Sequence, residues 1–420
     1  MKRLFFFAGI LILGSLSAQE QGSLDWDIDS IFDEVPRESF IEEDKTGTAG
    51  STVLQSIQQR GFTFDANYAL IMGHSTGWYE SPWSAGRDNE GYYQEFVLKL
   101  HGSFGVDAQI SEIFRAKSAV YFEVPNFGFR LGDFFFDYNF YNAVFFRGGK
   151  YNLSWGISPN NDFTSLLSRV PKDGPGGESF IFKVDIPAGI GGVQALTMTR
   201  ADLLNGVIPK IDDFGFGGKY NLALRWADFN MGVFYQTSMP LRGFLSIKTT
   251  IFGVELYNEW LTAIDVQKPA ETTGAVNLGF AHDFYGGNLR AAGEVIYNAE
   301  GNAYWYSPET ILGKAEISPF IKGISGVLNL SLRLGEKGQP RIFVQALFAP
   351  PENSFRFIPG FSLNPWSNIE LYLAVPMTLG SKDGYYHQNT VNKDNSGRPL
   401  PFSVLLLLNL NGGVRSRHNF

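Results

Sequence analysis

The chain has 420 residues, of which 18% are charged and 15% are aromatic, and it contains no cysteine. The absence of cysteine excludes a disulfide scaffold, a thiolate zinc site and a cysteine nucleophile. The aromatic content argues against intrinsic disorder, which is typical of chains with few aromatic residues and a high net charge.

The N-terminus has the pattern of a secretory signal peptide. Lys2 and Arg3 are basic, residues 4–16 are almost entirely apolar, and residues 15–18 include the small side chains that precede a cleavage site. The apolar run is too short to cross about 30 Å of hydrocarbon as a helix. We therefore expect residues 1–18 to be removed after export.

Residues 19–60 are predicted to form an acidic N-terminal arm. Between positions 20 and 44 the arm has one basic residue, Arg37, and its acidic residues are Glu20, Asp25, Asp27, Asp29, Asp33, Glu34, Glu38, Glu42, Glu43 and Asp44. Residues 45–420 contain 31 basic and 32 acidic residues, so most of the net charge of −8 belongs to the arm. A nearly neutral body offers no electrostatic surface for nucleic acid. We favour a solvated tail for the arm, and a partner-binding segment or a plug are the alternatives.

From residue 61 onward the dominant pattern has a period of two, which places alternate side chains on opposite faces of a strand. In residues 62–72, Phe62, Phe64 and Tyr68 alternate with polar or small residues. About 19 runs of roughly 8–12 residues follow this pattern, which is close to the length that a tilted membrane-spanning strand needs. Strands of soluble proteins are typically about 5–6 residues long.

The connections between these runs alternate between long and short. Residues 74–91 and 157–177 are long connections, whereas residues 105–107 and 139–142 are short ones. Such alternation is typical of outer-membrane barrels, which have long extracellular loops and short periplasmic turns. We therefore predict an all-β fold, a single transmembrane antiparallel β-barrel over residues 61–420. A barrel with both ends in the periplasm needs an even strand number, so we predict 18 strands, with 16 as the alternative.

The most specific local segment is residues 147–156, in which Arg147, Gly149 and Lys150 precede a Ser-Trp-Gly triplet at 154–156. This spacing resembles one strand of the porin-type barrels of Gram-negative outer membranes, including alginate-export-like and related substrate-selective porins. The resemblance covers this strand and the start of the loop after it, and it implies a channel through the barrel.

The period of two also predicts which way this segment faces. Side chains expected to face lipid are Tyr151, Leu153 and Trp155, and those expected to face the interior are Lys150, Asn152 and Ser154. A bulge at Gly148 and Gly149 would turn Arg147 inward as well.

The following loop, residues 157–177, contains a predicted short helix at 163–169 and a glycine-rich turn at 173–177. In the resembling porins such a loop folds into the lumen and narrows it. On that basis the constriction would be formed by Asp162, Arg169, Lys172 and Asp173, opposite Arg147 and Lys150 on the wall. Fixed charges at a constriction set ion preference. An ordinary surface loop is an equally weighted alternative.

The clearest strands place six basic and five acidic side chains on the predicted inner face. The basic residues are Lys99, Lys150, Lys219, Arg225, Arg290 and Arg333, and the acidic residues are Asp65, Glu95, Asp228, Glu294 and Glu370. This near balance predicts weak charge selectivity.

No arrangement of residues argues for an enzyme. The sequence has none of the common motifs of serine hydrolases, zinc proteases, phosphate-binding loops or EF-hands. The five histidines, His74, His101, His282, His387 and His418, form no recognisable catalytic group. We expect no catalytic residue, no cofactor and no metal site.

We therefore predict an outer-membrane porin for small hydrophilic solutes or ions, with an arm in the periplasm. One alternative is a barrel without a channel role, which carries a hydrophobic substrate or acts as an adhesin. A second is a soluble exported all-β protein. The expected partners are outer-membrane lipid, lipopolysaccharide and the barrel-assembly machinery, and either a monomer or an oligomer fits the sequence.

Overall fold

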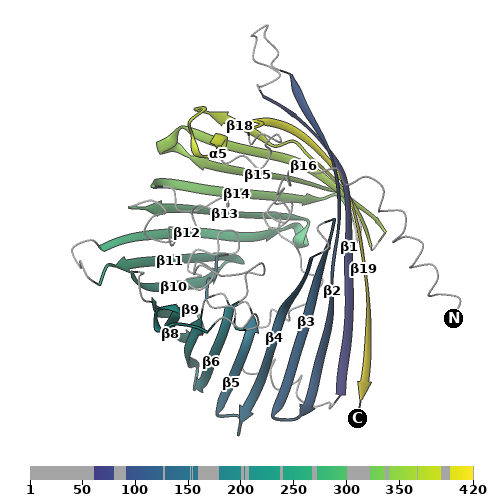
Figure 1. Cartoon of the computed structure of the whole chain (residues 1–420). Helices are drawn as coiled ribbons and strands as arrows, with labels where there is room; N and C mark the ends of the chain where they lie inside the picture. The colour runs from purple at the N-terminus through teal and green to yellow at the C-terminus, as the bar shows by residue number, and fades with distance from the viewer. Residues whose placement is uncertain are drawn as a thin grey trace, which may run out of the picture.

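The computed structural model describes residues 61–79, 91–125, 128–151, 153, 155–158, 179–199, 203, 208–236, 240–266, 272–299, 322–335, 340–366, 368–388 and 398–419. These residues form one antiparallel sheet that closes on itself (Figure 1). Closure is made by β1 (Gly61–Trp78), which pairs with β2 (Tyr92–Ser111) on one side and with β19 (Phe402–Asn419) on the other. The predicted all-β barrel is therefore confirmed.

The barrel has 18 strands, as predicted. β17 (Ile369–Ala374) and β18 (Met377–Gly380) are two segments of one barrel strand, because both pair with β16 and with β19 on either side of Pro376. The other strands are β3 (Phe114–Val124), β4 (Gly128–Phe140), β5 (Val144–Tyr151), β6 (Ser179–Ala188), β7 (Gly191–Thr199), β8 (Phe214–Ala223), β9 (Asp228–Gln236), β10 (Leu241–Ile251), β11 (Val254–Ile264), β12 (Thr272–Phe284), β13 (Leu289–Asn298), β14 (Gly323–Arg333), β15 (Arg341–Ala349) and β16 (Ser354–Trp366).

Among the described residues, helical structure is limited to short pieces. They are η2 (Ile211–Asp213), η3 (Tyr285–Gly287), η5 (Pro350–Glu352) and α5 (Tyr385–Gln388). Within the described residues, no helix is long and apolar enough to cross a membrane.

The period of two in the sequence separates the two faces of the sheet. On β2, Phe96 and Phe104 are exposed on the outer face, and Phe96 has 67% of its surface exposed. Glu95 and Lys99 alternate with them and therefore lie on the inner face. An outer face of exposed apolar side chains is what a barrel presents to hydrocarbon.

The two ends of the barrel differ in the length of their connections. At one end, the short-turn end, β1 begins beside the end of β19, and neighbouring strands join through turns such as residues 112–113, 189–190 and 252–253. Phe252 and Gly253 have φ angles of 53° and 80°, the left-handed conformations of the tightest hairpin turns. At the other end, the long-loop end, the long connections are residues 79–91, 152–178, 200–213, 299–322 and 381–401.

The predicted short turn at residues 105–107 is wrong. β2 continues through these residues to Ser111, and Gly105 pairs with both Asp65 and Ala119. Phe104 and Val106 remain on the outer face, so a glycine within the strand does not interrupt the alternation. The chain reverses seven residues later, because the turn lies at residues 112–113.

The interior contains two apolar clusters beside its polar side chains. The inner aromatic cluster lies on β4 to β13 and contains Phe135, Tyr151, Trp155, Phe234 and Phe244, with aliphatic side chains between them. The second cluster lies on β1, β2, β14 to β17, α5 and β19, and its aromatic members are Phe343, Tyr372 and Tyr386. A polar lining therefore covers only part of the inner face.

The predicted signal peptide and acidic arm lie outside the described residues, and β1 begins at Gly61. Both assignments remain predictions.

Candidate functional site

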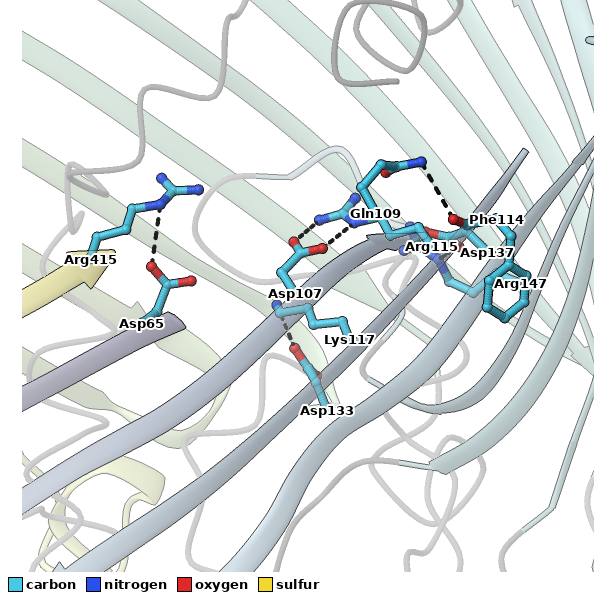
Figure 2. A network of polar contacts seen from close by, with 10 residues as sticks. All are labelled: Asp65, Asp107, Gln109, Phe114, Arg115, Lys117, Asp133, Asp137, Arg147 and Arg415. Carbon is cyan, nitrogen blue, oxygen red and sulfur yellow. Dashed lines mark hydrogen bonds and ion pairs between the residues drawn. The ribbon is translucent and has the colours of Figure 1, made fainter. Parts of the chain in front are cut away.

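A row of paired charges crosses the inner face from β19 through β1 to β5 (Figure 2). The pairs are Arg415 Nε with Asp65 Oδ1 at 3.3 Å, Arg115 Nε with Asp107 Oδ1 at 2.8 Å, Lys117 Nζ with Asp133 Oδ2 at 3.0 Å, and Arg147 Nε with Asp137 Oδ1 at 2.6 Å. We call these eight residues the charged row. Each pair joins two adjacent strands, and each cation has a carboxylate beside it, so the row adds little net charge to the interior.

Arg147 makes several contacts on the inner face. Its second nitrogen, Nη2, donates to Asp137 Oδ2 at 3.0 Å, which makes the pair bidentate. The guanidinium carbon also lies 4.4 Å from the ring centre of Phe135 and 5.5 Å from that of Tyr151. These distances fit cation–π contacts. Arg147 is therefore held on the wall by a carboxylate and two aromatic rings.

The polar contacts continue onto β6 and β7. Lys183 Nζ lies 2.8 Å from Asp185 Oδ2, and Gln194 Nε2 donates to Asp185 Oδ1 at 2.7 Å. The carbonyl oxygen of the same Gln194 side chain accepts a hydrogen bond from the indole N–H of Trp155. Gln194 thus links the charged inner wall to the chain that follows β5.

Residues 155–158, which we call the inward segment, lie inside the barrel. Trp155 is 1% exposed, and its ring centre lies 5.8 Å from that of Phe244 on β10. Further along, the Ile157 N–H donates to Glu259 Oε1 at 3.2 Å, and Ser158 Oγ donates to Glu294 Oε1 at 2.7 Å. The chain therefore leaves β5 and crosses the interior to reach β11 and β13.

Two buried carboxylates receive the inward segment. Glu259 and Glu294 are 0% and 2% exposed. Glu259 also accepts from Asn277 Nδ2 at 3.2 Å, and Glu294 also accepts from the Tyr257 hydroxyl at 2.7 Å. Because a buried carboxylate is costly without hydrogen bonds, these donors hold both acceptors in place for the segment.

The predicted facing of Lys150, Tyr151 and Trp155 is reversed in the structure. Tyr151 points inward and packs on Phe135 at a ring distance of 5.6 Å, and Trp155 is also inside. Lys150 pairs in register with outward residues, and its Nζ donates to the carbonyl oxygen of Leu131 at 2.6 Å.

The predicted bulge explains the error. The pairings of β5 with β4 and β6 show no register shift at Gly148 or Gly149. Arg147 and Tyr151 therefore share the inner face through uninterrupted alternation. The strand register had placed Tyr151 and Trp155 against lipid, and both lie in the inner aromatic cluster instead.

The other predicted site residues fall into three groups. Glu95 and Lys99 on β2 and Lys219 on β8 lie on the inner face, and Lys219 is opposite Gln194 in the pairing of β7 with β8. Arg225 is not on the wall, because it lies in the exposed turn between β8 and β9. Outside the described residues lie Asn152, Ser154, Asp162, Arg169, Lys172 and Asp173.

The sequence reasoning missed Glu259 and Asp137 as site residues. On β11, Leu256, Trp260 and Thr262 face outward, and Glu259 lies between them in the alternation. The period of two could therefore have placed Glu259 on the inner face. Its role could not be found this way, since its partner Ile157 is 102 residues away in the chain.

A groove of about 1060 Å³ lies on the outer face rather than in the interior. It crosses β7 to β13, where the small outward residues Ala195, Gly218, Gly243 and Gly274 leave space between larger apolar side chains. This groove is separate from the charged row and the inward segment.

The sequence matches no protein-family model and no curated protein. Solved structures do match the fold. OccAB4 of Acinetobacter baumannii has a TM-score of 0.52 and 9% identity, over 85% of this chain and 100% of that chain. OccK11 (OpdR) of Pseudomonas aeruginosa also has a TM-score of 0.52 and 9% identity, over 85% and 98%. A BenF-like porin from Pseudomonas fluorescens Pf-5 has a TM-score of 0.51 and 9% identity, over 84% and 99%. At these identities the likeness is one of fold.

Proposed function

We propose that this protein is a channel of the bacterial outer membrane through which small hydrophilic solutes or ions diffuse. The observation that carries the proposal is the inward segment inside a closed barrel of 18 strands. Ile157 and Ser158, the first residues of the long connection after β5, reach Glu259 and Glu294 across the interior. A chain segment that is fixed across the interior of a barrel narrows the pore without blocking it.

The two alternative functions fit the interior and the outer face less well. A carrier of hydrophobic molecules has no evident use for a row of charged pairs along its inner face. A soluble exported protein would expose large apolar side chains such as Phe96, Phe216 and Leu278 to water. The fold shared with the BenF-like porin adds support for a channel.

We also propose that residues 157–177 form the constriction. Support comes from the first two residues of this loop, which are bonded inside the barrel. If the loop continues inward, Asp162, Arg169, Lys172 and Asp173 would set the charge at the narrowest point. Lys219, on the inner face of β8 opposite Gln194, lies close to the start of this loop because Gln194 also binds Trp155.

Weak charge selectivity is the expected behaviour of the wall itself. In the charged row every cation pairs with a carboxylate, so oppositely charged groups cancel over a short distance. Any strong preference for anions or cations would therefore come from the constriction rather than from the charged row on β19 and β1 to β5. We propose no enzymatic activity for the barrel.

The proposed setting follows from the two ends of the barrel. We place the short-turn end in the periplasm and the long-loop end outside the cell, as in outer-membrane barrels generally. Residues 1–18 would direct export, and the acidic arm would lie in the periplasm. Lipopolysaccharide, outer-membrane lipid and the barrel-assembly machinery are the proposed partners, and the oligomeric state is left open.

Planar-bilayer recording tests both parts of the proposal. The full chain is refolded in detergent, heat-modifiable migration on a gel confirms folding, and single-channel current is recorded. Deletion of residues 161–176 should raise the conductance, whereas deletion of residues 302–318 from another long connection should leave it nearly unchanged. Absence of current through a correctly folded barrel would contradict the channel. Equal conductance of the two deletions would contradict the constriction alone.

A further inference from the structure

Arg356 is a buried cation on the inner face of β16. Its side chain is 1% exposed, and its partners in register are Leu347 on β15 and Thr378 on β18. Ser354 and Ile358, the inner-face residues on either side of it along β16, are also buried. The guanidinium therefore lies in a largely apolar part of the wall near the long-loop end.

This guanidinium has no counter-ion in the part of the chain that the structure describes. Its Nε and Nη1 are both buried and neither donates a hydrogen bond. No carboxylate among the described residues forms an ion pair with Arg356. Arg115 and Arg147 on the same inner face are each paired with an aspartate, so Arg356 differs from these two arginines.

A buried arginine keeps its positive charge, since the guanidinium is not deprotonated in proteins. A buried charge without a partner strongly destabilises a fold, and native structures pair it or bind an ion to it. The low-dielectric surroundings of Leu347 and Ile358 strengthen the attraction of any anion that reaches the guanidinium.

We propose that Arg356 binds a small monovalent anion of the size of chloride, which stays in the wall as part of the folded barrel. Donors are available beside the guanidinium. Ser354 Oγ accepts a hydrogen bond from the Tyr386 N–H at 2.9 Å, which leaves its own hydroxyl proton to donate. The Thr378 hydroxyl lies on the neighbouring strand in register with Arg356. Because Arg356 is almost fully covered, the anion is a resident ion and not a permeating one.

The position also predicts what the anion stabilises. Tyr386 belongs to α5 in the connection between β18 and β19, and it packs into the second apolar cluster. The same Ser354 that faces the proposed anion holds the backbone of Tyr386. Loss of the anion should therefore loosen the connection over β16 before it affects the distant inward segment.

The test compares the refolded full chain in sodium chloride and in sodium gluconate at equal ionic strength, because gluconate is too large for the site. The midpoint of heat-modifiable unfolding should rise with chloride and reach a plateau. Arg356→Met should remove this dependence, and it should be more stable than the native protein in gluconate because it lacks the unpaired charge. Arg225→Met is the matched control, since Arg225 lies in the exposed turn between β8 and β9, and it should keep the chloride dependence.

The proposal would be overturned if the unfolding midpoint of the native protein did not change with chloride. It would also be overturned if the midpoint of Arg356→Met rose with chloride as that of the native protein does. If Arg356→Met does not fold, Arg356→Lys provides the same comparison, because it keeps the charge but not the fork of donors and should need roughly tenfold more chloride. Crystals soaked in bromide give an independent readout. They should show an anomalous peak beside the guanidinium, and its absence at saturating bromide would also refute the site.

Discussion

Ser158 donates a 2.7 Å hydrogen bond to Glu294, although 136 residues separate the two positions in the chain. Glu294 belongs to β13, whereas Ser158 lies in the connection after β5. This contact therefore fixes the inward segment to a strand that is not a neighbour of β5 in the sheet. The bond ends on a carboxylate that is 2% exposed, where charge-assisted hydrogen bonds are strong.

Glu294→Ala should release the inward segment. The substitution removes the acceptor of both Ser158 and Tyr257, at a cost of about 1.5–3 kcal/mol for hydrogen bonds to a charged group. We expect noisier single-channel current and faster proteolysis after β5. Glu294→Gln keeps an acceptor oxygen and should be milder. Glu255→Ala, on the exposed rim of β11, is the control, and equal noise in both alanine variants would show that Glu294 does not anchor the segment.

Trp155→Ala should destabilise the whole barrel, since the indole is buried in the inner aromatic cluster. Removal of a large buried aromatic side chain typically costs about 3–5 kcal/mol. The measurement is the urea midpoint of the barrel refolded in lipid vesicles. Trp226→Ala makes the same chemical change in a turn where the side chain is 66% exposed, and it should shift the midpoint little. Similar losses in both variants would mean that Trp155 is not part of a packed interior.

Asp137→Asn should shift the ion preference toward anions. The change leaves the Arg147 guanidinium without its bidentate partner on the inner face. A reversal-potential measurement in a salt gradient should detect the shift, and Asp137→Asn combined with Arg147→Gln should return it toward the native value. The stability cost of breaking this partly exposed pair should be about 1 kcal/mol or less. An unchanged reversal potential would place this pair away from the path of the ions.

His387 makes the connection between β18 and β19 sensitive to pH. Burial lowers the pKa of His387, Lys382 lowers it further, and Asp383 acts in the opposite direction. As the pH falls through the ordinary histidine value of about 6.5, the unfolded segment binds a proton before the folded one does. The folded connection therefore loses stability on acidification until the pH passes below the lowered pKa.

Amide hydrogen exchange of residues 381–388 measures this effect. Protection should be weaker at about pH 5.5 than at about pH 8, after correction for the intrinsic exchange rate. In His387→Gln the difference should disappear. If the variant keeps the same pH dependence, another group in the connection is responsible.

The strand number and the two faces of most strands could be predicted because the period of two is a local property of the sequence. The error at Lys150, Tyr151 and Trp155 arose because a bulge was expected at Gly148 and Gly149, and the pairings of β5 show no register shift there. Tyr151 and Trp155 were placed against lipid, but both pack in the inner aromatic cluster with Phe135 and Phe244. The contact of Ile157 with Glu259 could not be predicted at all, since no local pattern links positions so far apart.

The pairing of β1 with β19 determines when the barrel can be completed. Each of these strands has 18 residues, and Gly61 is matched with Asn419 and Trp78 with Phe402. The first and last strands therefore depend on each other, and every earlier stage of assembly carries two open sheet edges that could pair with another chain. Such long-range pairing is slow to form. A chain that stops before β19 would keep both edges exposed, so truncation before Phe402 should favour pairing with other chains over closure of the barrel.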